Sequence, residues 1–541
     1  MLLIECKDIR KYYGERLILE IEELKIYEGD RIGIVGINGS GKTTLLNILS
    51  KRLEPDQGYV RTYGSSSYVS QIDDPDINIL SDEMASRFGV DFSWKESMSG
   101  GEKTRFKVAA ALEENSDVLF ADEPTSNADL ESIRLMEDRF RARNGTLVLI
   151  SHDRSFLDRL CNQILEIEDG KVSTYKGNYT AYKDQKIMEL ERKQFEYQEY
   201  VRERKRLQSA IGEIKGKSSS IRQAPRRMGN SEARLHKMGG QRAKATLDSA
   251  AKNIEKRIEH MERKEKPREE PKIKFDIPDS SRSHSRILVE GKNLNKSFDT
   301  RVIFKDSEFM IENGAKVALI GPNGCGKSTL IKMIMDGEEG IRVAKSAKIG
   351  YFSQDLSILN EGRSIIENVM ENSIYSETFA RIFLARLLFR KEAVHRKVKV
   401  LSGGERVKVS FAKILMEDFN MLILDEPTNY LDIMSLEIIE EALQEYNRTL
   451  LFVSHDRKFI GSIADQVMTI EGGKIDLYKG NYEEYLAGKD KSLDKREEQI
   501  MVLRNRLSEL ISRISMPSKG DDLESLDIEY RNVLEELNRI R

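Results

Sequence analysis

The chain has 541 residues, 33% of them charged, and a formal net charge of −3 at pH 7. A chain of this length can form roughly three to four compact units with large apolar cores. Its three cysteines, Cys6, Cys161 and Cys325, form no CxxC pair and no short-spaced cluster with histidine, which argues against disulfides and zinc and favours a reducing compartment.

The N-terminal residues and the hydropathy pattern bear on location. Acidic and basic residues occur between Met1 and Asp8, too early for a signal peptide. No uninterrupted apolar run approaches the roughly 18 residues of a membrane-spanning helix. We therefore expect a cytoplasmic protein without a membrane partner.

The first functional signal along the chain is a glycine-rich loop between an apolar strand, residues 31–35, and a predicted helix. The loop reads Gly36-Ile37-Asn38-Gly39-Ser40-Gly41-Lys42-Thr43, followed by Thr44, and fits the pattern G-x-x-x-x-G-K-[ST]. In this pattern backbone N–H groups wrap phosphates, the lysine neutralises phosphate charge and the Thr or Ser hydroxyl ligates Mg²⁺. The context of strand, turn and helix is the one that the motif needs.

Four further motifs follow the loop. After Gln71 comes the segment Met98-Ser99-Gly100-Gly101-Glu102, whose glycines at a helix start would let N–H groups and the serine hydroxyl approach a phosphate. A buried-type strand then ends in Asp122-Glu123, and another ends in His152. Ligand chemistry belongs at the carboxyl ends of such strands, so we expect these side chains to share one site.

The whole series occurs twice. A second loop reads Gly321-Pro322-Asn323-Gly324-Cys325-Gly326-Lys327-Ser328, followed by Thr329. Its downstream motifs, Gln354, Leu401-Ser402-Gly403-Gly404-Glu405, Asp425-Glu426 and His455, repeat those of the first copy, the last three at an offset of 303 positions. The second copy has 20 additional residues between its glutamine and its serine. We therefore predict an internal duplication of α/β domains in which the first copy has an abbreviated helical subdomain.

The segment between the copies, from residue 184 to about residue 272, is predicted to form a helical hairpin. Leu190, Gln194, Tyr197 and Val201, and later Leu247, Ile254, Ile258 and Met261, recur at three- and four-residue spacing. Gly212, Gly216, Pro225, Gly229 and Gly239-Gly240 are expected to break helix regularity between the two arms.

The tip of this hairpin is basic. From Arg202 to Lys244 there are 13 Lys and Arg residues against three acids, a charge of +10, while the remainder of the chain sums to −13. A basic prong on an acidic body favours a polyanionic partner, although a solvated coiled-coil face is the alternative. The candidate phosphate contacts are Arg222, Arg226, Arg227, Arg234, Lys237, Arg242 and Lys244.

The last part of the chain carries two runs of regularly spaced apolar residues on either side of Pro517-Ser518-Lys519-Gly520. This pattern predicts a second helical hairpin. The predicted domains are thus residues 1–183 and 284–486, with an interdomain linker, 184–283, and a C-terminal extension, 487–541.

The two signature segments, Ser99-Gly100-Gly101-Glu102 and Ser402-Gly403-Gly404-Glu405, together with the paired loops, resemble those of the ATP-binding cassette proteins. The resemblance implies that the two domains pair head to tail within one monomeric chain. Each ATP would then lie between the loop of one domain and the signature of the other. One site would combine Lys42, Thr43, Gln71, Asp122, Glu123 and His152 with Ser402, Gly403 and Gly404; the other would combine Lys327, Ser328, Gln354, Asp425, Glu426 and His455 with Ser99, Gly100 and Gly101.

The resemblance also implies a role for each member. Glu123 and Glu426 would polarise the attacking water, His152 and His455 would steady the γ-phosphate, and Mg²⁺ would be held by Thr43, Gln71 and Asp122 or by Ser328, Gln354 and Asp425. Tyr13 and Phe298 are candidates to stack on adenine, or they are core residues. The segment that follows the paired acidic residues differs between the two copies. The first copy reads Ser126-Asn127-Ala128-Asp129 and departs from the family pattern, whereas the second reads Asn429-Tyr430-Leu431-Asp432 and is closer to it. Equal turnover at the two sites is therefore in doubt, and one site that only binds is the alternative.

Tandem cassettes, a charged helical linker and the segment Tyr-x-Gly-Asn-Tyr at Tyr175 and Tyr478 resemble the ABC-F family of ribosome-binding ATPases. The long tip of the linker and the abbreviated first helical subdomain most resemble the antibiotic-resistance branch of this family, the Vga-type ribosome-protection proteins. This implies binding to the exit-tRNA site of the ribosome, with the linker tip reaching large-subunit rRNA and the P-site tRNA. Drugs of the lincosamide, pleuromutilin and streptogramin A types would be dislodged, and ATP hydrolysis would reset the protein. The alternatives are a housekeeping translation factor and, more remotely, the ATPase of a transporter or of a DNA-repair machine; we expect no DNA partner.

Overall fold

The computed structural model describes residues 1–221, 230–266, 285–299, 301–353, 358–429, 431–489, 503–504, 506–508, 510–511, 514 and 523–540. The chain divides into two compact units. One comprises Met1–Thr174 and Ile273–Arg541, and the other is Tyr175–Lys272.

The first half of the larger unit is built on one nine-stranded sheet. The order of its strands is β4 (Gln57–Thr62), β1 (Leu2–Tyr13), β2 (Arg16–Tyr27), β9 (Lys171–Lys176), β8 (Gln163–Glu168), β3 (Arg31–Gly36), β7 (Thr146–Ile150), β6 (Val118–Asp122) and β5 (Ser66–Val69). β8, β3, β7, β6 and β5 pair in parallel, whereas β4, β1 and β2 pair antiparallel. The apolar strands β6 and β7 are buried along their whole length, as parallel strands covered on both faces are.

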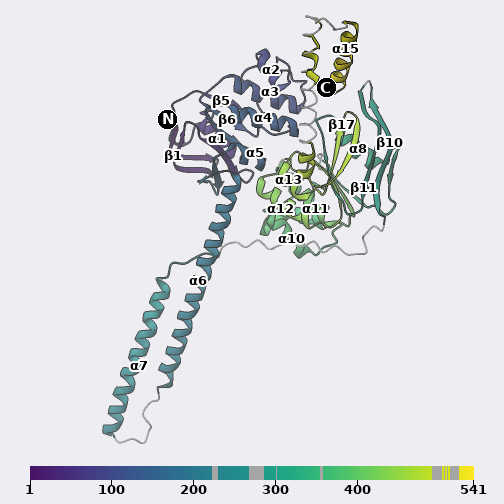
Figure 1. The fold of residues 1–541 in the computed structure, drawn as a ribbon. Coiled ribbons are helices and arrows are strands. Elements are labelled where there is room, and N and C mark those ends of the chain that lie inside the picture. The colour runs from purple at the N-terminus through teal and green to yellow at the C-terminus, as the bar shows by residue number, and fades with distance from the viewer. Residues whose placement is uncertain are drawn as a thin grey trace. The chain divides into compact units, whose positions relative to one another are not determined.

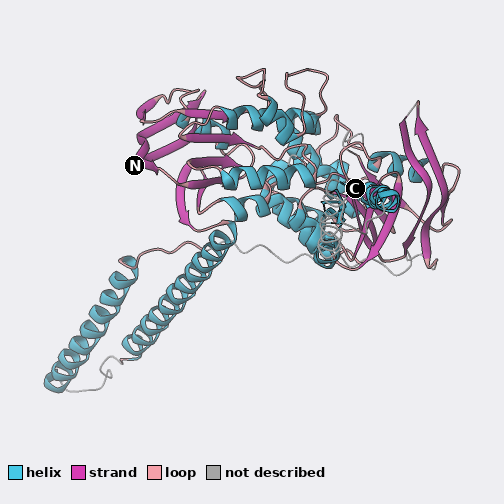
Figure 2. Cartoon of the chain, turned by 45° about the horizontal axis from the view of Figure 1, so that its top comes forward, coloured by secondary structure: helices cyan, strands magenta, loops and turns pink. Residues whose placement is uncertain are grey.

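The helices of this half connect the parallel strands, as in other doubly wound α/β folds. They are α1 (Lys42–Leu49), α2 (Asp82–Phe88), α3 (Gly100–Glu113), α4 (Leu130–Ala142) and α5 (Arg154–Leu160). Figure 2 shows these helices in cyan against the magenta strands. α1, α4 and α5 each follow the carboxyl end of a central strand, so the loops that precede them gather at one edge of the sheet.

The second half repeats this plan with a six-stranded sheet and a separate three-stranded sheet. The strands are β14 (Ile349–Phe352), β15 (Met421–Asp425), β16 (Thr449–Val453), β12 (Lys316–Ile320), β17 (Gln466–Glu471) and β18 (Lys474–Lys479), and then β11 (Arg301–Glu312), β10 (Ile287–Phe298) and β13 (Ile341–Val343). The helices are α8 (Lys327–Asp336), α9 (Ile365–Met370), α10 (Glu377–Arg386), η2 (Lys391–His395), η3 (Val398–Val400), α11 (Gly403–Met416), α12 (Ile433–Glu445) and α13 (Arg457–Ile463).

The predicted difference between the two helical subdomains is confirmed. In the described part of the chain, α2 is the helix between β5 and α3, whereas α9, α10, η2 and η3 lie between β14 and α11. The additional residues of the second copy therefore form helices, and these pack into the large apolar cluster that includes Ile365, Phe383 and Val398.

The smaller unit is a helical hairpin of α6 (Tyr179–Ser220) and α7 (Asn230–Glu259), which run alongside each other in Figure 1. Ser218 donates to Asp248 at 2.7 Å, and Lys215 pairs with Glu255 at 2.7 Å. The prediction that glycines interrupt the arms is wrong, because Gly212 and Gly216 lie within α6 and Gly239-Gly240 within α7. The cost of about 1 kcal/mol per glycine in a helix is small beside the packing of two long helices on each other.

In the C-terminal extension the structure describes one complete helix, α15 (Leu523–Ile540), and parts of the segment between residues 503 and 514. Leu507, Leu510, Leu526 and Leu537 are buried, and Arg506 pairs with Glu529 at 2.6 Å. These contacts agree with the expected hairpin, whose predicted turn at Pro517–Gly520 lies outside the described residues. Among the helices described, none is both long and apolar enough to cross a membrane.

Candidate functional site

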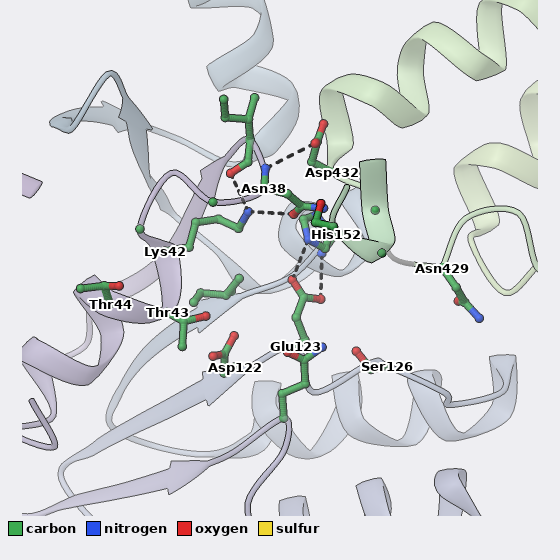
Figure 3. A pocket seen from close by; sticks show the side chains of 18 of the residues that line it. Asn38, Lys42, Thr43, Thr44, Asp122, Glu123, Ser126, His152, Asn429 and Asp432 are labelled. Carbon is green, nitrogen blue, oxygen red and sulfur yellow. Dashed lines mark hydrogen bonds and ion pairs between the residues drawn. The ribbon is translucent and has the colours of Figure 1, made fainter. Parts of the chain in front are cut away.

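A cavity of about 950 Å³ lies between the two halves of the larger unit, where the first glycine-rich loop faces the second signature segment. Its lining includes most of the residues that the sequence assigns to the first site. These are Tyr13, Asn38, Gly39, Gly41, Lys42, Thr43, Thr44, Gln71, Asp122, Glu123 and His152 from the first half, with Ser402, Gly403 and Gly404 from the second. The predicted head-to-tail combination is therefore brought together around one space, drawn in Figure 3.

The glycine-rich loop holds its lysine in place through its own backbone. The Lys42 ammonium donates to the carbonyl oxygens of Gly36 at 2.8 Å and Ile37 at 3.2 Å, and lies 3.5 Å from Oδ1 of Asn38. Burial lowers the pKa of Lys42, partly offset by the nearby carboxylates. An ammonium with few water contacts has a strong affinity for the charge of a phosphate group.

Gly41 shows why this loop needs glycine. It is the residue before α1 and has φ 102°, in the left-handed region, and an added Cβ would lie 2.8 Å from the Ile18 side chain. Gly326 takes the same place before α8, with φ 111°. In the second loop Lys327 donates to the carbonyls of Gly321 at 2.8 Å and Pro322 at 3.1 Å, so both copies fold alike.

Two carboxyl groups lie at the end of β6, and their environments differ. Burial raises the pKa of Asp122 to about 6, although a hydrogen bond from the Thr43 hydroxyl partly offsets this effect. Burial also raises the pKa of Glu123 to about 7, partly offset by the charge of Lys42. Glu123 lies 3.2 Å from Nε2 of His152 and accepts from the His152 backbone N–H at 3.3 Å, as Figure 3 shows. Burial lowers the pKa of His152 to about 3, so the imidazole is neutral at pH 7.

Both glutamates have a strained backbone. Glu123 and Glu426 each have φ 50°, in the left-handed region that glutamate rarely adopts. Such strain costs on the order of 1–3 kcal/mol and is common at functional sites. The same strain at both repeats indicates that this geometry aims each carboxylate into its site.

The second site is arranged differently around its glutamate. Asn429 donates to Glu426 at 2.6 Å, and the ring of His455 lies 3.8 Å from the same carboxylate. Ser126 occupies the matching position in the first half, where His152 contacts the glutamate directly. Burial lowers the pKa of His455 to about 4. Gln354 lies outside the described residues.

Each signature serine begins a helix. Ser99 precedes α3 and Ser402 precedes α11, and each forms a capping box with the glutamate three residues later. Their helix N-termini therefore present backbone N–H groups and a positive dipole end. At the second site, an added Cβ on Gly101 would lie 3.0 Å from the Asn323 side chain, so the first signature lies against the second loop.

The carboxylate and hydroxyl oxygens of each site fit Mg²⁺. The Ser328 hydroxyl donates a hydrogen bond to Asp425. Among the described residues, none donates a hydrogen bond to the buried Oδ1 atom of this carboxylate. Mg²⁺ is usually held by one or two such oxygens together with substrate phosphates and water. In the described part of the chain there is no cluster of three or more His, Cys, Asp or Glu residues suited to a metal.

The two aromatic candidates are not core residues. Tyr13 is 56% exposed at the end of β1 and lines the cavity, and Phe298 is 53% exposed at the end of β10. Both rings are therefore exposed enough to stack on adenine, and the stacking stays a prediction.

The sequence interpretation did not assign the aspartates that precede α4 and α12 to the site. Asp432 accepts from the Asn38 N–H at 3.3 Å, and Asp129 accepts from the Asn323 N–H at 3.1 Å. Each aspartate thus contacts the glycine-rich loop of the opposite half. The repeat offset of 303 positions between Asp129 and Asp432 could have identified them.

The predicted phosphate contacts of the hairpin belong to the smaller unit. Arg242 and Lys244 are exposed on α7. Arg234 and Lys237 lie within α7, and Arg222, Arg226 and Arg227 are outside the described residues. The exposure of Arg242 and Lys244 agrees with a role in binding a polyanion.

Comparison with known proteins identifies the family. A family model described as ABC transporter matches residues 19–84 and 304–429, and a second family model with the same description matches residues 165–275. The chain is 34% identical to the erythromycin resistance ATP-binding protein MsrA of Staphylococcus epidermidis, over 84% of this chain and 95% of the relative. It is 30% identical to ABC transporter F family member 5 of Arabidopsis thaliana, over 92% of this chain and 78% of the relative. The chain belongs to the ABC-F family of ATP-binding cassette proteins.

Another relative of this ABC-F chain is the ribosome protection protein VmlR of Bacillus subtilis, 33% identical over 92% of this chain and 90% of the relative. Among solved structures, the RNase-L inhibitor matches with a TM-score of 0.61 over 89% of this chain and 93% of the other, at 21% identity, which shows a shared fold. The predicted tandem cassettes, the family and ATPase activity are thus confirmed. The roles of single residues stay predictions.

Proposed function

We propose that this chain binds the ribosome in an ATP-dependent manner and protects it from antibiotics that act at the peptidyl-transferase centre. The observation that carries the proposal is the similarity, over nearly the whole chain, to two relatives that are named for erythromycin resistance and for ribosome protection. We propose the exit-tRNA site as the place of binding, and lincosamide, pleuromutilin and streptogramin A drugs as those dislodged. The protein would act in the cytoplasm as a monomer.

ATP would control binding by joining the two cassettes. The first site lies between the Lys42 loop and the Ser402 signature, so an ATP there would contact both halves. In this proposal Lys42 and the helix N-terminus at Gly403 bind phosphate oxygens, and Asp122 with Thr43 would hold Mg²⁺, which neutralises phosphate charge when bound. The bound nucleotides favour the closed form of the pair, and the ribosome selects that form.

Hydrolysis would then reset the protein. Glu123 can accept a proton from water, since its pKa of about 7 suits a general base near neutral pH. His152, neutral at pH 7, can donate one N–H to the γ-phosphate while its backbone N–H keeps Glu123 in position. Loss of the γ-phosphate removes one of the groups that bridge the halves, and the closed form is no longer favoured.

The hairpin is the part that we propose to contact ribosomal RNA and the P-site tRNA. α6 has 42 residues, a length of about 63 Å at ~1.5 Å per residue. The exposed Arg242 and Lys244 and the basic surplus of the segment support contacts with phosphates. For the C-terminal hairpin, the buried leucines support an intramolecular coiled coil rather than a direct ribosomal contact.

A second function, a housekeeping translation factor that acts on stalled ribosomes, has its own support. The chain is 30% identical to ABC transporter F family member 5 and 28% identical to the ATP-binding protein Uup of Escherichia coli, and neither relative is named for resistance. Such a factor would use the same clamp and the same linker. The two functions differ in whether drug susceptibility changes.

Expression in a drug-sensitive bacterium separates the two functions. We expect inhibitory concentrations of the three drug classes to rise several-fold, and erythromycin belongs in the panel because MsrA is named for it. The matched controls are Glu123→Gln with Glu426→Gln and a chain shortened between Lys217 and Lys237, both of which should lose protection. Unchanged susceptibility to every drug, with equal expression and with the chain still on ribosomes, would favour the housekeeping function.

A further inference from the structure

Six charged residues lie at the contact between the two cassettes and follow the repeat. Glu137 and Glu440, Asp153 and Asp456, and Arg154 and Arg457 are each 303 positions apart. Arg154 donates to Glu440 at 2.6 Å, and Arg457 donates to both carboxylate oxygens of Glu137. All six are largely buried. Ion pairs at such depth contribute little net stability, because desolvation offsets the attraction, so a different role is worth seeking.

The two glutamates lie on helices that also hold the opposite phosphate-binding loop. Asp129 caps the start of α4 through the Ser132 N–H at 2.9 Å, and its second oxygen accepts from Asn323 of the other half at 3.1 Å. Glu137 lies eight residues later, about 12 Å along the same helix. α4 of the first cassette therefore contacts two places in the second one.

The second of these places is next to a site histidine. Arg457 is the first residue of α13 and lies two positions after His455. Asp456 between them caps α13 through the Phe459 N–H at 3.0 Å, so the histidine, the cap and the arginine share one short stretch of backbone. α12 repeats the arrangement. Asp432 accepts from the Asn38 N–H, and Glu440 accepts from Arg154, which lies two positions after His152.

We propose that Glu137–Arg457 and Glu440–Arg154 are positioning pairs, each of which holds the histidine of one ATP site from the opposite cassette. In each cassette, the aspartate that precedes α4 or α12 binds the glycine-rich loop of the facing site, and the glutamate of the same helix binds the arginine beside the histidine of that site. The helix therefore sets the distance between the loop and the histidine. When the cassettes separate, both contacts break, and the histidine is no longer held in position. The inference rests on the proposed role of His152 and His455 at the γ-phosphate, and it is independent of any action on ribosomes.

The two pairs differ in their surroundings. Arg159, on the same cassette as Glu137, also contacts that carboxylate at 3.0 Å, whereas Ser462 occupies the matching place near Glu440. Loss of Arg457 therefore leaves Glu137 with a cation, but loss of Arg154 removes the closest cation of Glu440. Arg457→Gln is accordingly the milder substitution for folding and the better first test.

The test measures ATP turnover at one site at a time in the full chain. Glu123→Gln leaves Glu426 as the intact general base, and Glu426→Gln leaves Glu123. In the Glu123→Gln background we expect Arg457→Gln to lower kcat about tenfold or more, because small displacements of a positioned group have large effects on rate. The KM for ATP should change less than twofold, since Lys327 and its loop are unaltered. In the Glu426→Gln background the same substitution should change kcat less than twofold.

Arg457→Lys, which keeps the ion pair, should recover most of the rate, and Lys458→Met is the matched control. Lys458 pairs across the same contact with Asp158 at 2.5 Å, and Asp158 lies on α5 rather than on α4 or α12. Binding of a fluorescent ATP analogue and the thermal midpoint verify folding of each variant. If Arg457→Gln does not fold, Glu137→Gln in the same two backgrounds replaces it.

Equal loss of turnover at both sites, or loss through KM alone, would overturn the inference and leave the pairs as simple interface contacts. His455→Ala in the Glu123→Gln background tests the underlying assignment separately. If that variant retains full turnover, the role of the histidine is wrong, whatever the arginine variants do.

Discussion

Replacing Asp432 by alanine should destabilise the second cassette far more than replacing Asp129 destabilises the first. Asp432 is fully buried, accepts from Lys408 at 2.9 Å and caps α12 through the Ser435 N–H at 2.8 Å. Asp129 caps α4 in the same way, but the residue that matches Lys408 is Arg105, which donates to the Ser132 hydroxyl at 2.8 Å instead.

The size of the difference follows from these contacts. Asp432→Ala leaves the buried Lys408 ammonium without its carboxylate, and removing one partner of a buried pair costs about 3–5 kcal/mol. Asp129→Ala removes a helix cap, which costs about 1–2 kcal/mol. The difference between the two unfolding free energies should therefore be on the order of 1–4 kcal/mol.

The dependence of stability on pH gives a second measure of how much Asp432 contributes to the free energy of unfolding. Burial alone would raise the pKa of this carboxyl, but Lys408 and the Ser435 hydrogen bonds lower it to about 2. A depressed pKa stabilises the fold at pH values above the unfolded value of about 3.9, and this contribution is lost as the pH falls toward 2. The difference between a pKa of about 3.9 in the unfolded chain and about 2 in the folded one corresponds to roughly 2–3 kcal/mol, in line with the range above.

Urea unfolding resolves the two cassettes if two probes are used. Trp94 is the one tryptophan in the chain and lies in the first cassette, so its fluorescence reports on that half. Circular dichroism follows both. With a slope of about 2–3 kcal/mol per M, Asp432→Ala should lower the midpoint of the second-cassette transition by about 1–2 M. Equal, small losses for the two substitutions at pH 7 would refute the argument from the buried pair.

Two further predictions concern the nucleotide and the hairpin. Tyr13→Ala should raise the KM for ATP about tenfold, since base stacking contributes about 1–3 kcal/mol, whereas Tyr27→Ala, a similarly exposed control that is not among the residues lining the cavity, should leave KM unchanged. Arg242→Glu with Lys244→Glu should weaken ribosome binding and flatten its dependence on salt, without altering the ATPase rate measured in the absence of ribosomes. Lys252→Glu is the control for charge on the same helix, and an equal loss of binding there would contradict a contact localised near Arg242.

Much of the site could be predicted because its chemistry depends on short, local patterns. The strand before Gly36 and the helix from Lys42 follow from the apolar run and the glycine-rich loop, and α3 begins at Gly100-Gly101, which the sequence placed at a helix start. The pairing of Lys42 with Ser402 came from the family resemblance, since no local pattern joins residues so distant in the chain.

Other features depended on tertiary contacts that no local pattern reports. Gly212 and Gly216 predicted a break, yet α6 continues through them, because its partner α7 supplies contacts such as Ser218–Asp248. The contact of Asn429 with Glu426 could not be read from their spacing, because it depends on the left-handed backbone of Glu426. The Arg457–Glu137 pair joins residues 320 positions apart, and the sequence analysis did not identify it, because no local pattern joins residues so distant in the chain.

The most direct test of the central claim is co-sedimentation of the chain with Glu123→Gln and Glu426→Gln on ribosomes, with and without ATP. Both substitutions leave the phosphate-binding loops intact and remove the proton acceptor, so bound ATP should persist. We predict that the double variant accumulates in the ribosome fraction when ATP is present and stays in the supernatant without it. If it remains in the supernatant at saturating ATP while it still binds nucleotide, the proposed link between the ATP clamp and the ribosome is wrong.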